Sequence, residues 1–223
     1  MTRTTAPAAA PSLAPTLAET GHNGHGASAA PAPALPRELA GPRATGWWGV
    51  VLLIANEAAL FGALLTGYFY LRFNAPAWPL GGIKPPDLLL PGINTVLLVS
   101  SSVAVMWAEH GVTHGHQWHL RLGLAVAFVL GLAFLAVQLY EYSQETFTPQ
   151  VNAYGSLFYT ITGLHGLHVL AGLIMLGVVQ VRAWLGHFNE RRYLGVQGAA
   201  MYWHFVDVVW LFVFSIVYVS PHW

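Results

Sequence analysis

The chain has 223 residues, of which 55% are hydrophobic and 8% charged, and its formal charge at pH 7 is zero. Soluble domains usually carry about 25% charged residues, so this composition argues against a water-exposed globule. The balanced charge gives no net field that would attract nucleic acid. The sequence has no cysteine, which excludes disulfides, thiolate metal sites and thiol catalysis.

Residues 1–46 differ from the rest of the chain. They are rich in Ala and Pro and show no apolar periodicity. Such a segment cannot bury enough surface to fold alone, so we expect a disordered cytoplasmic tail. The segment lacks the continuous apolar core of a secretory signal and is expected to be retained. We interpret His22 and His25 as solvated side chains of this tail.

From residue 47 onward the sequence consists of long apolar runs. A membrane span needs ~20 mostly apolar residues to cross a ~30 Å hydrocarbon core. Proline, glycine, histidine and other polar residues separate the runs. The sequence therefore predicts an all-α membrane domain over residues 47–223, with five transmembrane helices at about 47–71, 90–108, 122–142, 155–184 and 198–219.

The basic residues predict the orientation of the spans. Cytoplasmic connections carry an excess of Lys and Arg. With five spans, one side of the membrane holds Arg3, Arg37, Arg43, Arg121, Arg182, Arg191 and Arg192, and the other holds Arg72 and Lys84. We therefore expect a cytoplasmic N-terminus and an external C-terminus.

The first predicted span contains Glu57. It lies ten residues into the span, which is about 15 Å along a helix and close to the midplane. No basic residue is near it in sequence, and its apolar surroundings favour the neutral acid. An ionisable side chain at this depth is energetically costly, so a structural or functional role must account for it. Two readings stay open: a carboxyl hydrogen-bonded between packed helices, or a proton or water site.

Polar pairs also occur in the third and fourth predicted spans. Gln138 and Glu141 are three residues apart and share a helix face, which favours a hydrogen bond between helices. His165 and His168 have the same spacing, among glycines that allow close helix approach. Imidazole can bind metals. No Glu-x-x-His pair of the di-iron kind occurs in the predicted spans, so hydrogen bonding to helices or lipid is the favoured interpretation.

The last predicted span carries His204 and Asp207, which can pair across one helical turn. Trp203 and Trp210 lie beside them and offer indole donors. A mutually satisfied polar cluster is favoured over catalysis. A further group of histidines crowds the connection between the second and third spans, and we expect these side chains to be solvated: His110, His114, His116 and His119.

Several sequence motifs in the membrane part support a more specific assignment than these physical arguments do. They are Asn56-Glu57-Ala58, Ile93-Asn94-Thr95, Trp107-Ala108-Glu109-His110, Gln138 with Glu141-Tyr142, Tyr154-Gly155-Ser156, and the segments 162–169 and 202–212. In this order they resemble subunit III of cytochrome c oxidase over about residues 47–223. The resemblance implies a helical accessory subunit that packs directly against subunit I, which holds the haems and copper.

The same resemblance implies further properties. Subunit III has no catalytic centre and no metal, binds phospholipid, and supports the proton uptake and lasting activity of subunit I. Subunit II and possibly a small subunit IV would complete a complex in a bacterial plasma membrane, and nucleic acid is not a partner. By position, Glu57 matches the family's membrane carboxylate, and His204 and Asp207 match a pair in the final helix. Glu141, His165 and His168 match other polar positions.

The sequence departs from many family members, which have seven spans, because the disordered tail replaces the first two. Three other functions compete with this one. A quinol oxidase subunit or a nitric-oxide-reductase accessory subunit would share these motifs. A proton or small-solute transporter is disfavoured because the chain shows no internal repeat. A stand-alone haem or copper enzyme would need ligands that the span histidines do not clearly provide.

Overall fold

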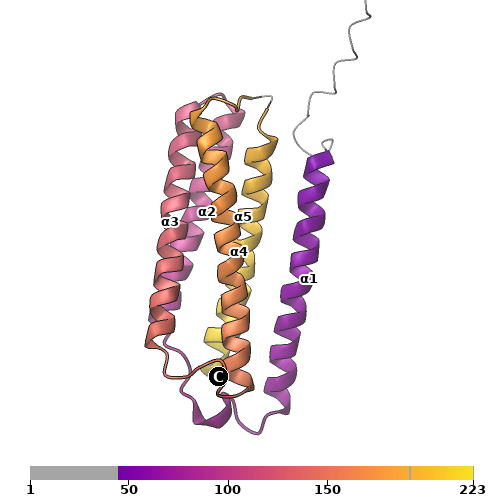
Figure 1. The fold of residues 1–223 in the computed structure, drawn as a ribbon, viewed down its shortest axis with the longest axis vertical. Helices are drawn as coiled ribbons and strands as arrows, with labels where there is room; N and C mark the ends of the chain where they lie inside the picture. The colour runs from indigo at the N-terminus through magenta and orange to yellow at the C-terminus, as the bar shows by residue number, and fades with distance from the viewer. Residues whose placement is uncertain (1–44, 191, 223) are drawn as a thin grey trace, which may run out of the picture. The chain divides into compact units, whose positions relative to one another are not determined.

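A computed structural model of the chain describes residues 45–190 and 192–222, and the expected tail lies almost wholly outside them. The described residues form the predicted all-α architecture with five long helices (Figure 1). These are α1 (Thr45–Asn74), α2 (Leu89–Thr113), α3 (Gln117–Gln144), α4 (Ala153–Trp184) and α5 (Leu194–Val213). Short turns of helix occur at η1 (Leu80–Gly82), η2 (Phe214–Val219) and η3 (Ser220–His222).

All five long helices are apolar and long enough to cross a membrane, which confirms the predicted number of spans. The helices are longer than most of the apolar runs, because the helical backbone continues into the polar residues that flank each run. For example, α2 runs past the expected end at residue 108 to Thr113, and α3 continues to Gln144. With 32 residues, α4 is about 48 Å long, more than the hydrocarbon core requires.

Glycines set the closest helix contact, between α2 and α3. A Cβ atom on Gly123 would lie 2.7 Å from the carbonyl oxygen of Ala104 and 2.8 Å from the Cβ of Ala108. A Cβ on Gly111 would lie 2.5 Å from the Cβ of His119. Only glycine therefore lets these two backbones approach so closely, as small residues do in membrane helix pairs.

A single indole fills the space where α3, α4 and α5 meet. Trp203 of α5 is fully buried. Its ring occupies the space where a Cβ on Gly131 of α3 or Gly172 of α4 would sit, at 2.7 and 2.8 Å. The bundle of α2 to α5 is therefore held by shape complementarity around aromatic side chains.

Helix α1 packs differently, along α4 and α5 (Figure 1). Only Phe61 and Tyr68 of its 30 residues are buried. Its end is fixed by Arg72, whose guanidinium donates hydrogen bonds to the hydroxyl and the carbonyl oxygen of Ser220. Most of the surface of α1 is thus left for lipid or for another protein.

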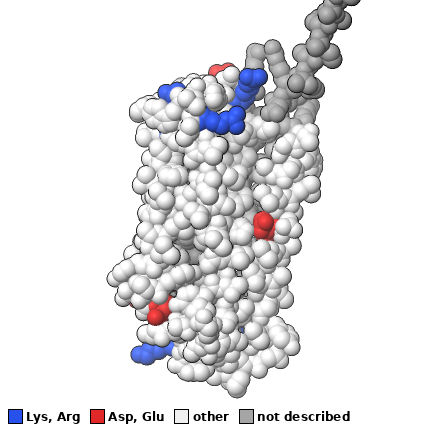
Figure 2. Space-filling model, in the orientation of Figure 1, with Lys and Arg blue, Asp and Glu red and all other residues white. Residues whose placement is uncertain are grey.

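Charged side chains gather near the two ends of the visible face, and the surface between them is largely uncharged (Figure 2). Arg121 donates to the carbonyl oxygen of Ala183, so the α2–α3 and α4–α5 connections share one end. Arg72 belongs to the opposite end. The five long helices of the described residues alternate in direction, so residues 45 and 222 lie at opposite ends of the bundle (Figure 1).

Candidate functional site

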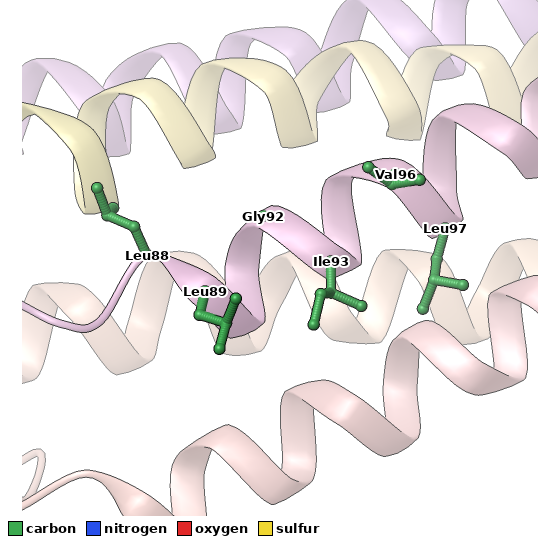
Figure 3. A pocket seen from close by; sticks show the side chains of 6 residues that line it. All are labelled: Leu88, Leu89, Gly92, Ile93, Val96 and Leu97. Carbon is green, nitrogen blue, oxygen red and sulfur yellow. The ribbon is translucent and has the colours of Figure 1, made fainter.

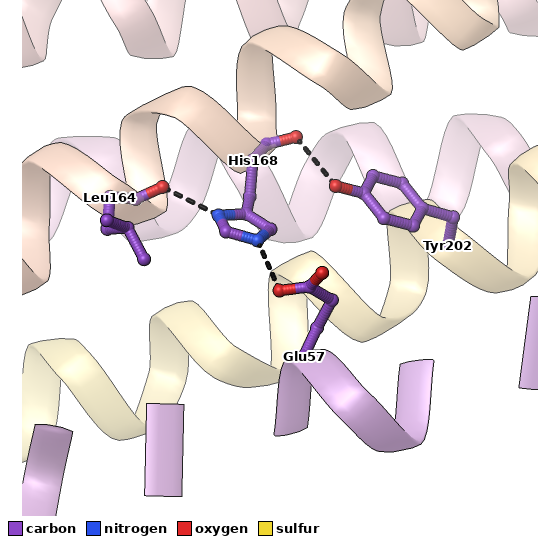
Figure 4. A network of polar contacts seen from close by, with 4 residues as sticks. All are labelled: Glu57, Leu164, His168 and Tyr202. Carbon is purple, nitrogen blue, oxygen red and sulfur yellow. Dashed lines mark hydrogen bonds and ion pairs between the residues drawn. The ribbon is translucent and has the colours of Figure 1, made fainter. Parts of the chain in front are cut away.

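Glu57 of α1 and His168 of α4 meet between the helices (Figure 4). The Oε2 atom of Glu57 lies 2.9 Å from Nε2 of His168. His168 Nδ1 donates to the carbonyl oxygen of Leu164 at 2.7 Å, which fixes the ring and directs Nε2 toward the carboxyl group. Tyr202 of α5 donates to the carbonyl oxygen of His168 at 3.4 Å. Three helices therefore position this contact.

The geometry of this pair requires one proton between Nε2 and Oε2, because both atoms otherwise offer only lone pairs. The side chains of His168 and Glu57 are 14% and 18% exposed. A paired carboxyl and imidazole is far less unfavourable in a membrane than either group alone. The contact therefore places a shared hydrogen between α1 and α4 within the span.

A second polar group joins α2 and α5. Sequence reasoning paired His204 directly with Asp207, but the structure places Ser102 of α2 between them. The Ser102 hydroxyl lies 2.8 Å from Nδ1 of His204 and also hydrogen-bonds to Oδ2 of Asp207. Asp207 is 6% exposed, and its Oδ1 atom has no hydrogen-bond partner.

The neighbouring indoles add two more contacts between the same helices. Trp203 donates to the hydroxyl of Ser101 at 2.9 Å, and Trp210 donates to the hydroxyl of Thr95 at 3.0 Å. Sequence reasoning named the indole donors but missed all the hydroxyl acceptors. The signal was present, because serines 100, 101 and 102 are an unusual polar run inside an apolar span.

The third polar group joins α3 to the turn after α5. Gln138 donates to Oε2 of Glu141 at 3.1 Å and to the hydroxyl of Tyr218 at 3.3 Å. Gln138 and Glu141 are each 3% exposed, and each keeps one side-chain oxygen without a partner. Tyr218 was not identified from the sequence, where it reads as one more aromatic residue near a span end.

His165 does not make the hydrogen bond expected of it. The side chain is wholly buried, and neither ring nitrogen has a partner. Its neighbours are aromatic: the ring centroids of Trp210, Phe134 and Phe61 lie at 5.0, 5.8 and 6.2 Å. His165 is therefore a packed ring in the core, although it shares a helix face with His168.

Metal ligation by the histidines and carboxylates and an apolar surface groove are the two remaining candidates for a site. Within residues 45–190 and 192–222, no three His, Asp or Glu side chains are arranged to hold a metal ion. The histidines between α2 and α3 contact one another in pairs: the ring centroids are 4.0 Å apart for His110 and His114.

A shallow groove of about 400 Å³ follows the start of α2 (Figure 3), and its lining is apolar: Leu88, Leu89, Gly92, Ile93, Val96 and Leu97.

The described residues form five helices of membrane-spanning length. Glu57, Glu141 and Asp207 in these helices each form a hydrogen bond with another side chain of the protein. These features define a polytopic membrane protein with hydrogen-bonded polar groups inside the helix bundle. Residues 43–222 match the family described as cytochrome c oxidase subunit III. The chain belongs to this family.

Curated relatives named cytochrome c oxidase subunit 3 agree with this assignment. The chain is 40% identical to that of the alga Pylaiella littoralis, over 76% of this chain and 65% of the relative. It is 39% identical to that of Synechocystis over 77% and 74%, and 37% identical to that of the rabbit Oryctolagus cuniculus over 79% and 68%. The chain thus spans slightly less than two thirds of the algal relative's length.

Proposed function

We propose that this chain is the non-redox accessory subunit III of a haem-copper terminal oxidase of aerobic respiration. The family match over residues 43–222 carries the proposal. The arrangement of the polar residues supports it, since Glu57, Glu141 and Asp207 each contact another side chain of this chain. In this proposal subunit I holds the haems and copper, and this chain packs directly against it. Subunit II and a small subunit IV complete the assembly.

The proposed role is to stabilise subunit I and to support its proton uptake. The exposed apolar residues support a role in assembly, because helices α1 to α5 leave large side chains uncovered. Leu52 of α1 is 68% exposed, Leu139 of α3 68% and Ile174 of α4 61%. In a bilayer such faces contact lipid or the helices of a partner. The proton held between Glu57 and His168 supports the second part of the role.

We further propose that the chain binds phospholipid and lies in a bacterial plasma membrane. The apolar groove at the start of α2 has a lining suited to an acyl chain (Figure 3). Of the three relatives described above, the cyanobacterial one has the largest share of its length covered, 74%. The distribution of basic residues supports a cytoplasmic N-terminus.

Two experiments test the proposal. The first purifies the complex from native membranes through a tag on this chain. The second compares oxidase activity between wild type and a strain from which this chain is deleted. We expect a haem-bearing companion to co-purify. Deletion should leave electron transfer to oxygen possible and the haem spectrum nearly unchanged, but proton delivery should slow and activity should decay over fewer turnovers. The decay should be faster at high pH, where protons are scarce. Returning the chain to the deletion strain should restore the number of turnovers before inactivation. Immediate and total loss of activity, with the haems still bound, would contradict an accessory role.

A further inference from the structure

The group formed by Asp207, Ser102 and His204 reaches the outer surface where α2 and α5 meet. One position earlier on each helix, Ser101 and Trp203 are fully buried and hydrogen-bonded to each other at 2.9 Å. Each residue of a helix is rotated about 100° from the one before it. Ser102 and His204 therefore face outward and are only half-buried. We refer to the surface formed by Val99, Ser102 and Met106 of α2 with His204, Val208 and Leu211 of α5 as the α2–α5 seam.

The depth of this seam excludes contact with lipid headgroups. Ser102 lies thirteen residues after Leu89 and eleven before Thr113, which is about 20 and 17 Å from the two ends of α2. Acyl chains, which do reach this depth, offer no hydrogen-bonding atoms. The residues that surround the polar group are apolar and exposed: Val99 by 44%, Met106 by 52%, Val208 by 50% and Leu211 by 44%. A partner at this seam must therefore be a protein helix.

The positions of the hydrogen atoms in this group determine whether Nε2 of His204 is a donor or an acceptor toward such a partner. The Ser102 hydroxyl has one hydrogen and lies between His204 Nδ1 and Asp207 Oδ2. If Asp207 is protonated on Oδ2, it donates to Ser102, Ser102 donates to Nδ1, and the ring hydrogen sits on Nε2. If Asp207 is ionised and His204 is imidazolium, Nε2 again carries a hydrogen.

Both arrangements are uncharged in sum and satisfy the hydrogens inside the group. A proton on Oδ1 of Asp207 would instead be a buried donor without an acceptor, since Oδ1 has no partner. The arrangement with a bare Nε2 and an ionised Asp207 leaves a net charge in the middle of the span, which is unfavourable. Nε2 of His204 is therefore a donor, and the described part of the chain supplies no acceptor for it.

We propose that the α2–α5 seam docks onto a transmembrane helix of a companion subunit, and that this helix presents an oxygen acceptor to Nε2 of His204. The acceptor is a backbone carbonyl, a hydroxyl or a carboxylate, and apolar side chains of the same helix cover Val99, Met106, Val208 and Leu211. The inference rests on the proposed function only in that a companion subunit exists.

Photo-crosslinking in the assembled complex tests which surface is covered. A benzophenone amino acid replaces Val208 of the seam or, as the matched control, Val129 of α3, a valine that is 63% exposed on another helix. We expect Val208 to give an adduct with a companion subunit and Val129 to give none. Adducts of Val208 with lipid alone, or with a second copy of this chain, would overturn the proposal, and so would an equal yield from Val129.

Two substitutions of His204 test the donor. His204→Phe keeps a ring of similar bulk but removes the hydrogen, whereas His204→Gln keeps an N–H donor near the position of Nε2. We expect the affinity of this chain for the complex to fall about tenfold in His204→Phe, equivalent to about 1.4 kcal/mol, and to stay near wild type in His204→Gln. Equal retention of both variants would refute the donor role.

The crosslinking experiment uses an otherwise wild-type chain and does not depend on the folding of the His204 variants. It also separates the two proposals. If no haem-bearing subunit co-purifies with the tagged chain, the proposed function fails. If the subunit co-purifies but Val208 reacts only with lipid, the docking surface alone fails.

Discussion

Glu57 and His168 are 111 residues apart in the chain, yet their Oε2 and Nε2 atoms lie 2.9 Å apart, so this contact is a polar link between α1 and α4. We predict that removing one partner destabilises the packing of α1 by about 1–3 kcal/mol, because the other partner is left without its hydrogen bond. Glu57→Ala and His168→Ala should each lower the midpoint of thermal unfolding of the complex in detergent.

The double variant provides the control for this prediction. If the two side chains act as a pair, Glu57→Ala combined with His168→Ala should be less destabilising than the sum of the single changes. Strict additivity of the two single effects would show that the contact contributes nothing of its own.

Gly123 is one of the two glycines at which the α2–α3 contact leaves no room for a side chain, the other being Gly111. We predict that Gly123→Ala destabilises the protein by about 1–3 kcal/mol, because the new Cβ would force the two backbones apart. Gly62→Ala in α1 is the matched control, since a Cβ there meets nothing within 4 Å. Thermal unfolding of the two variants side by side checks this, and equal midpoints would contradict the close-contact explanation.

Glu145 follows the last residue of α3, outside the span, and gives a prediction about pH. Burial, and then the nearby Asp87 carboxylate, raise the pKa of Glu145 above its ordinary 4.5. The folded state therefore holds this proton more tightly than the unfolded state, so stability is lost as pH rises from 4.5 through the folded pKa. Glu145→Gln should stabilise the protein at neutral pH by less than about 1 kcal/mol, because the side chain stays partly solvated.

The measurement for Glu145 is the unfolding midpoint of variant and wild type between pH 4 and pH 8. The difference should vanish toward pH 4, where the carboxyl is protonated in both states. Asp87→Asn should give a smaller gain than Glu145→Gln, since burial is the larger cause of the raised pKa. A gain that is equally large at acid pH would show that charge is not the reason.

The positions of the two ends of the chain are predicted by the basic residues. An alkaline phosphatase fused after Trp223 should be active on the external side, whereas the same reporter inserted at Gly115, between α2 and α3, should be inactive. Reporter activity with the opposite pattern would reverse the orientation, and activity at both positions would contradict the odd number of spans.

The sequence predicted the five helices well because each contains enough consecutive apolar residues to cross a bilayer. It predicted the helix ends poorly. Hydropathy detects the hydrocarbon boundary, whereas backbone hydrogen bonds continue α2 through Glu109 and His110, where the side chains reach polar surroundings. Helix length and apolar length are different quantities in a membrane protein.

Contacts within one helix turn were also predictable, and contacts between helices were not. The spacing of Gln138 and Glu141 places them on one face, and they hydrogen-bond. The same rule placed His204 beside Asp207 but gave no indication of Ser102, which comes from α2. Nothing near Glu57 in sequence points to His168, because the register of two antiparallel helices is fixed by packing along their whole length.

The sparse packing of α1 has a consequence for biosynthesis. Its buried residues and its Glu57 contact depend on α4 and α5, which the ribosome produces last. At about 5–20 residues per second, the 111 residues between Glu57 and His168 take on the order of ten seconds to synthesise. During that interval the first helix lies in the membrane with its carboxyl group unmatched by imidazole. A nascent chain arrested before residue 168 would therefore expose a polar group to lipid, which is a feature that membrane quality control can recognise.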